Sequence, residues 1–158
     1  MTQTNKKRKW EEFFMGNAFL AAKRSKNPKT QLGACIISEE NYTVGVGYNN
    51  MTKGMEYLEG SNINDSNLYE CHAVLNAILN KNKAELNNCK IYVNSFPCNK
   101  CIKSILQSGI NEIVYAKDGT GINPVSKKML DEANIKYRHW HSMSEDNKIV
   151  LSCRKMDL

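Results

Sequence analysis

The sequence predicts an α/β fold in which a largely parallel sheet is covered by helices on both faces. In the second half of the chain, apolar strand-like runs alternate with helical segments, a pattern typical of such sheets. The 158 residues fit one domain, which at this size buries roughly two-thirds of its unfolded surface without disulfide staples. No repeat or composition shift marks a domain boundary, so we expect residues 1–158 to form a single domain.

The first half of the chain predicts one helix and a strand hairpin. Apolar residues recur at helical spacing from Trp10 to Arg24, where the stretch "SKNP" ends the pattern. Segments 32–38 and 43–48 are apolar, and the short polar stretch between them predicts a hairpin. Residues 49–70 are polar and rich in Asn, Ser and Gly, so we expect a long loop, which in a compact domain tends to be functional.

The second half predicts three helices and three strands. The strands are expected at residues 89–95, 112–116 and 135–140, and the helices at about 72–80, 98–107 and 124–133. In such sheets, ligands usually bind where the carboxyl ends of the strands lead into helix starts. We expect a C-terminal extension from about residue 142 to 158.

Composition restricts the protein's location and partners. No apolar run approaches the ~20 residues of a membrane span, and the amino terminus lacks the apolar stretch of a secretory signal. We therefore expect an intracellular, cytoplasmic protein without a membrane partner. The net charge of +6 favours anionic partners such as nucleotides or nucleic acid. Lys6 to Lys9 lie in a basic segment, residues 1–9, that we interpret as a solvated tail, with nuclear import or nucleic-acid binding as alternatives.

Three residues predict a metal site. Inside the cell, paired cysteines more often bind metal than form disulfides. Cys98 and Cys101 have the C-x-x-C spacing that, on the first turn of a helix, lets both thiolates reach one ion. His72 lies upstream at another predicted helix start, and Pro97 completes most of the H-x-E then P-C-x-x-C signature of zinc deaminases. Three protein ligands leave a fourth position open, which is the arrangement of a catalytic Zn²⁺.

The other cysteines and histidines are expected to have structural roles. The cysteines concerned are Cys35, Cys71, Cys89 and Cys153, and for these we expect buried thiols. Because Cys71 precedes His72, an accessory metal role is its alternative. His139 and His141 are expected to be solvated or packed.

Beyond the metal motif, longer stretches over about residues 10 to 138 also match a known family of enzymes. They include "CHAVLNAILNKN" and "YVNSFPCNKCIKSILQSGINEIVYA". In these stretches the chain resembles deoxycytidylate (dCMP) deaminases. The resemblance implies a cytidine-deaminase-like α/β/α sandwich with a mixed sheet of about five strands, and zinc held by His72, Cys98 and Cys101. It also implies a homo-oligomer, often a hexamer, that hydrolyses dCMP to dUMP and ammonia.

The resemblance suggests a nucleotide-binding region as well. Its members are Arg24, Ser25, Lys26, Asn27 and Asn49. Cations and hydroxyl or amide donors in a turn suit a monophosphate. For each residue alone, an ordinary surface or turn role is the alternative.

The chain departs from the family motif at the residue that moves protons. Two positions after the ligand histidine the family has glutamate, whereas this chain has Val74. The glutamate relays protons between water, the ring nitrogen and the departing amine, and valine cannot carry a proton. General acid–base groups typically supply about 10² to 10⁴ in rate, or roughly 3 to 5 kcal/mol. We therefore predict that no catalytic residue is intact.

Glu70 is the candidate substitute. In an extended approach to the helix, residues 70 and 72 point to the same side. Glu70 nevertheless precedes the helix, so its carboxylate would approach the metal from another direction, and ligation of zinc or an ordinary capping role are its alternatives. Residues 50–69 also lack the Trp-Arg-Arg stretch of animal-type relatives, which leaves substrate fit and control by dCTP or dTTP open.

Three functions are consistent with these residues. The sequence favours a catalytically silent dCMP deaminase relative that keeps zinc and nucleotide binding and acts as a regulatory or assembly partner. The second is an active dCMP deaminase that uses Glu70, or one in which Val74 is an engineered change. The third is a module that binds single-stranded nucleic acid or protein, which the basic charge permits, although no groove of interleaved aromatic and cationic residues is evident.

Overall fold

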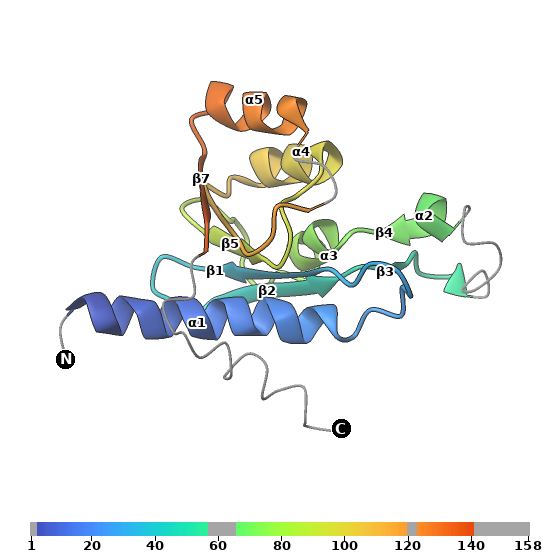
Figure 1. Cartoon of the computed structure of the whole chain (residues 1–158), viewed down its shortest axis with the longest axis horizontal. Coiled ribbons are helices and arrows are strands. Elements are labelled where there is room, and N and C mark those ends of the chain that lie inside the picture. Colours follow the sequence, from blue (N-terminus) through green and yellow to red (C-terminus); the bar gives the residue numbers. More distant parts are fainter. Residues whose placement is uncertain (1–2, 57–65, 120–122, 141–158) are drawn as a thin grey trace.

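A five-stranded sheet forms the centre of the computed structural model, which describes residues 3–56, 66–119 and 123–140 (Figure 1). The strands lie in the order β2-β1-β5-β6-β7. Their bounds are β1 (Gly33–Ile37), β2 (Thr43–Tyr48), β5 (Lys90–Val93), β6 (Glu112–Tyr115) and β7 (Lys136–His139). Strand β1 pairs antiparallel with both β2 and β5, whereas β5, β6 and β7 are parallel. The predicted mixed sheet of about five strands is thereby confirmed.

Helices cover both faces of the sheet. Helix α1 (Gln3–Ala22) lies on one face, and α3 (Ala73–Leu79), α4 (Asn99–Ser108) and α5 (Pro124–Glu132) lie on the other (Figure 1). Alternate residues of β1 face opposite layers, as a period of two requires. Cys35 and Ile37 pack with α1, while Ala34 and Ile36 belong to the larger core under α3 and α4. The result is a three-layer α/β/α sandwich.

Two glycines let helices approach the hairpin of β1 and β2 closely. A Cβ atom added to Gly33 would overlap the α1 backbone at Ala18. A Cβ atom added to Gly47 would overlap the α3 backbone at Ala73 and Ala77. Because α3 begins directly after His72, this contact fixes the position of that histidine relative to the sheet.

Helix α1 is longer than the sequence suggested. It begins at Gln3 rather than Trp10, so the basic segment is helical from Gln3 onward instead of forming a separate tail. Lys and Arg are good helix formers, which accounts for this extension. The carboxylate of Glu11 accepts hydrogen bonds from Arg138 and so connects helix α1 to β7, the edge strand of the sheet. None of the helices among the described residues is long and apolar enough to traverse a bilayer. The expected extension at about 142–158 lies outside the described residues.

The segment expected to be a long loop contains a small second sheet. Strand β3 (Asn50–Met51) pairs antiparallel with β4 (Glu70–Cys71), and the short helix α2 (Ser66–Tyr69) precedes β4. Thr52 reinforces the pairing, because its amide and its hydroxyl both donate to the carbonyl of Tyr69. Two-residue strands are too short to show a periodic pattern, so they could not be predicted from the sequence. Residues 57–65 lie outside the described ranges.

Candidate metal centre

His72 and Cys98 are the N-cap residues of two neighbouring helices. His72 precedes α3 and Cys98 precedes α4, each with extended backbone, and their carbonyls accept the first helical hydrogen bonds from Asn76 and Ile102. N-cap positions usually carry Ser, Thr, Asp or Asn, whose side chains bond to the helix amides. Neither His72 nor Cys98 does so. Their side chains are left to point at each other.

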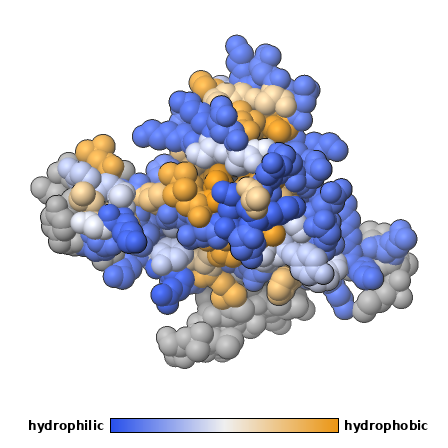
Figure 2. Space-filling view, turned by 180° about the vertical axis from the view of Figure 1, so that it is seen from behind, coloured by the Kyte–Doolittle hydropathy of each residue, from blue (hydrophilic) through white to orange (hydrophobic). Residues whose placement is uncertain are grey.

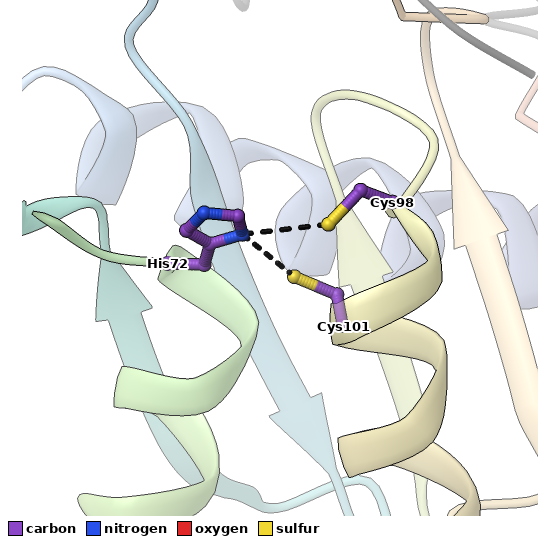
Figure 3. A group of neighbouring side chains, drawn as sticks. All are labelled: His72, Cys98 and Cys101. Atoms are coloured by element: carbon purple, nitrogen blue, oxygen red, sulfur yellow. Dashed lines mark hydrogen bonds between the residues drawn. The ribbon is translucent and has the colours of Figure 1, made fainter. Parts of the chain in front are cut away.

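The three predicted ligands meet in space and fit zinc. Nδ1 of His72 lies 3.4 Å from Sγ of Cys98 and 3.3 Å from Sγ of Cys101 (Figure 3). Bond lengths of about 2.3 Å for Zn–S and about 2.0 Å for Zn–N at a tetrahedral angle require N···S separations of about 3.5 Å. Within the described ranges, no fourth His, Cys, Asp or Glu joins these atoms, which all lie within 4.8 Å of one another. The residues are therefore positioned to bind Zn²⁺ with one coordination position open.

The electrostatics of the site favour a thiolate. A hydrogen bond with Cys101 is the main cause that lowers the pKa of Cys98 to about 3, and a bond with His72 adds to it against the opposing effect of burial. The pKa of Cys101 is raised because its thiol bonds to Cys98 and is buried. The bond to Cys98 also raises the pKa of His72. Thiolate is the form in which cysteine binds metal, so this donor set suits a soft divalent cation.

Val74 lies in the apolar core at the first turn of α3. Its side chain is 4% exposed and belongs to the same buried cluster as Ala73, Ala77 and Cys101. Nothing in valine can accept or donate a proton. The position two residues after His72 is therefore occupied by a buried aliphatic side chain.

Glu70 is bound by two of the residues predicted to contact a nucleotide. Nδ2 of Asn27 donates to Oε2 of Glu70, and Nδ2 of Asn49 donates to Oε1, each at 2.7 Å. The other donor contact of Asn49 is the carbonyl of Thr30 at 2.9 Å, and its Oδ1 accepts from the amide of Leu32 at 2.8 Å. Glu70 does not join the metal-binding group among the described residues. These contacts link sequence-distant segments beside the metal site.

The other predicted nucleotide-binding residues lie on the turn after α1. Ser25 is buried, and its Oγ accepts a hydrogen bond from the amide of Asn27. Arg24 and Lys26 are exposed on either side of it. The turn is held by Asn27, whose Oδ1 accepts from the amides of Lys29 and Thr30.

Two asparagines that the sequence reasoning missed also shape the site. Nδ2 of Asn76 donates to the carbonyl of Tyr48 at 2.8 Å and secures α3 to the end of β2. Asn94, after β5, accepts from the amide of Gly33 and donates to the carbonyl of Gln31. Asn94 follows a strand in a loop, where asparagine is common, and Asn76 lies within a helix, where nothing in the spacing of residues indicates a contact with Tyr48.

The remaining cysteines and histidines divide by location. Cys35 and Cys89 are buried free thiols, as expected. Cys71 is half-buried and stands outside the three-residue metal group. His139 packs edge-on against the ring of Tyr115, whereas His141 and Cys153 lie outside the described residues.

Comparisons with known proteins agree with this geometry. A model of the cytidine and deoxycytidylate deaminase zinc-binding region matches residues 8–117. A deoxycytidylate deaminase of Mus musculus is 47% identical over 116 residues, which is 69% of this chain and 65% of the mouse protein. One from Pongo abelii is 38% identical over 152 residues, or 90% of this chain and 84% of that protein. The chain thus spans about two-thirds of the mouse relative's length.

A solved structure shares the fold. The dCMP deaminase of the cyanophage S-TIM5, in complex with dCMP and dUMP, superposes with a TM-score of 0.73 at 19% identity. The match covers 89% of this chain and 99% of the phage protein.

Proposed function

The chain belongs to the cytidine and deoxycytidylate deaminase zinc-binding family, and from this premise we propose that it binds zinc and a pyrimidine nucleotide but turns dCMP over poorly or not at all. In this proposal it serves as a nucleotide-binding, regulatory or assembly partner. Intact zinc ligands beside a missing proton carrier support it. The mouse relative is a deoxycytidylate deaminase and the phage structure contains dCMP and dUMP, so dCMP is the first ligand to test.

The observation that carries the proposal is Val74. Zinc held by His72, Cys98 and Cys101 would supply Lewis acidity that activates water. Deamination also needs protons moved to the ring and to the departing amine, which a positioned carboxylate performs in zinc deaminases. The buried side chain of Val74 can exclude water but cannot move a proton. Loss of such a group costs about 10² to 10⁴ in rate.

The alternative, an active dCMP deaminase, depends on Glu70. Its carboxylate is half-buried and lies two residues before His72, which is the observation in its favour. Against it, both carboxylate oxygens accept amide hydrogen bonds from Asn27 and Asn49. A carboxylate whose two oxygens each accept an amide hydrogen bond is oriented toward those amides. This arrangement supports a fixed structural or binding role for Glu70.

An assembly role is supported by exposed apolar side chains. Leu75 and Leu79 of α3 are 37% and 68% exposed. Figure 2 shows hydrophobic residues gathered near the middle of the face opposite to that of Figure 1. Such surfaces often take part in protein contacts. A homo-oligomer, hexameric by resemblance, or a partner protein would cover them, and light scattering after size exclusion tests this.

Zinc content and nucleotide binding test the proposal together. We expect one zinc per wild-type chain by elemental analysis, and loss of zinc in Cys101→Ser. Cys71→Ser is the matched control, because Cys71 adjoins His72 but stands outside the ligand group, and it should keep its zinc. Calorimetry on the zinc-loaded wild type should detect dCMP binding without release of dUMP. Absence of zinc, or rapid conversion of dCMP, would refute the proposal.

A further inference from the structure

The carboxylate of Glu70 takes up the amide donors that were expected to face a nucleotide. Asn27 and Asn49 each donate to one of its oxygens at 2.7 Å. Hydrogen bonds from an amide to a charged carboxylate are stronger than those between neutral groups. A phosphate that used the Asn49 amide would have to replace Glu70 or the carbonyl of Thr30, and at Asn27 it would share the amide group with Glu70.

Asn49 has no donor left for a ligand. An amide nitrogen carries two hydrogens, and those of Asn49 go to Glu70 and to the carbonyl of Thr30. Its oxygen accepts from the amide of Leu32, and its side chain is only 1% exposed. Asn27 is oriented in a similar way, because its Oδ1 accepts two amides of its own turn and so directs its nitrogen at Glu70.

Glu70 has acceptor sites left over, and its side chain projects to the same side of the extended segment as the ligand His72. A carboxylate has about four acceptor sites, and the two amides use two of them. Glu70 begins β4, and the extended backbone continues through His72, with φ −71° and ψ 150°. Side chains two apart in an extended segment project to the same side, about 6.6 Å from each other. The side chain that shares this side with His72 is therefore a half-buried carboxylate and not a set of amide donors.

We propose that Glu70 is a specificity-determining residue that makes this site favour an uncharged pyrimidine nucleoside, with a free 5′-hydroxyl, over the corresponding 5′-phosphate. This inference rests on the proposed function, because it needs the site to bind a pyrimidine ligand. A sugar hydroxyl can donate to the spare acceptor sites of the carboxylate, whereas a phosphate dianion brings only acceptors and like charge.

The cations of the turn do not cancel this preference. Arg24 and Lys26 are exposed, and water and salt screen the attraction between an exposed cation and a phosphate. Glu70 is half-buried and held in place by two hydrogen bonds, so its repulsion is screened less.

Calorimetry with deoxycytidine and dCMP on the zinc-loaded full chain tests the inference. The wild type should bind deoxycytidine at least as tightly as dCMP. Glu70→Gln keeps the side-chain shape but removes the charge, and should raise the affinity for dCMP relative to deoxycytidine about tenfold, on the order of one like-charge repulsion at a partly screened site. The control Glu132→Gln removes an exposed charge near the end of α5 and should leave the ratio unchanged.

The outcomes separate the two proposals. An unchanged ratio in Glu70→Gln, or a wild type that binds dCMP more tightly than deoxycytidine, overturns the role of Glu70 while nucleotide binding stands. If neither ligand binds any of the three proteins, the proposed function fails and the inference fails with it. The comparison of the two ligands on the wild type needs no variant, so it tests the proposal even if Glu70→Gln does not fold.

Discussion

Replacing Asn49 by alanine should destabilise the protein far more than a typical asparagine substitution. The change removes a bond accepted from Leu32, a bond donated to Thr30 and a bond donated to the Glu70 carboxylate. Neutral bonds contribute about 1 kcal/mol each and one to a charged group about 1.5 to 3 kcal/mol. Because the partners would be left partly buried, we expect the free energy of unfolding to fall by about 3 to 5 kcal/mol.

Urea denaturation of the zinc-saturated protein, followed by circular dichroism, measures this loss. The midpoint should fall while the m-value stays unchanged, since the loss concerns stability and not compactness. Asn87→Ala is the matched control, because Asn87 is exposed and its side chain donates to the exposed Glu85, and it should change stability by less than about 0.5 kcal/mol. A loss below about 1 kcal/mol for Asn49→Ala would refute the reasoning that Asn49 organises the site.

Three further predictions follow from packing and charge. Gly47→Ala should cost about 3 kcal/mol or more and weaken zinc binding, because its Cβ would overlap the backbone of α3, and unchanged zinc affinity would count against that contact. Gly16→Ala in α1, with open space around the added Cβ, should instead stabilise the protein by about 0.5 to 1 kcal/mol in urea titrations. Burial raises the pKa of Glu112, but hydrogen bonds from Arg138 and Lys90 outweigh it and lower the pKa below its ordinary value of 4.5. Because the folded-state pKa is depressed, the ionised carboxylate stabilises the fold. The difference in free energy of unfolding between wild type and Glu112→Gln should therefore be largest at neutral pH and vanish as the pH falls through the folded-state pKa. A difference that does not depend on pH would contradict this.

The metal ligands could be predicted from sequence because their spacing is a chemical requirement. C-x-x-C on a helix start brings two sulfurs together whatever surrounds them, and His72 completes the donor set at a second helix start. The alternating strands and helices after β5 could also be predicted from the sequence, since apolar residues recur with a different period in strands and in helices. The amino-terminal boundary of α1 was not, because the lysines and arginines before Trp10 suit both a helix and a solvated tail.

The surroundings of Glu70 could not be predicted in the same way. Asn27 and Glu70 are 43 positions apart, and no periodicity relates an asparagine in a turn to a carboxylate in a two-residue strand. The same holds for Asn94, which bonds to segments about 60 positions upstream. Such long-range polar contacts depend on the finished fold, so only the structure reveals them.

Turnover of dCMP by the wild type, Val74→Glu and Val74→Gln, each with its zinc content measured, tests the central claim most directly. Gln matches Glu in size but cannot shuttle a proton, so it controls for the strain of placing a polar side chain in the core beside α3. The account predicts that the wild type and Val74→Gln remain at the level of the zinc-free control, while Val74→Glu forms dUMP at least about 10²-fold faster. Comparable turnover by the wild type and Val74→Glu would contradict it.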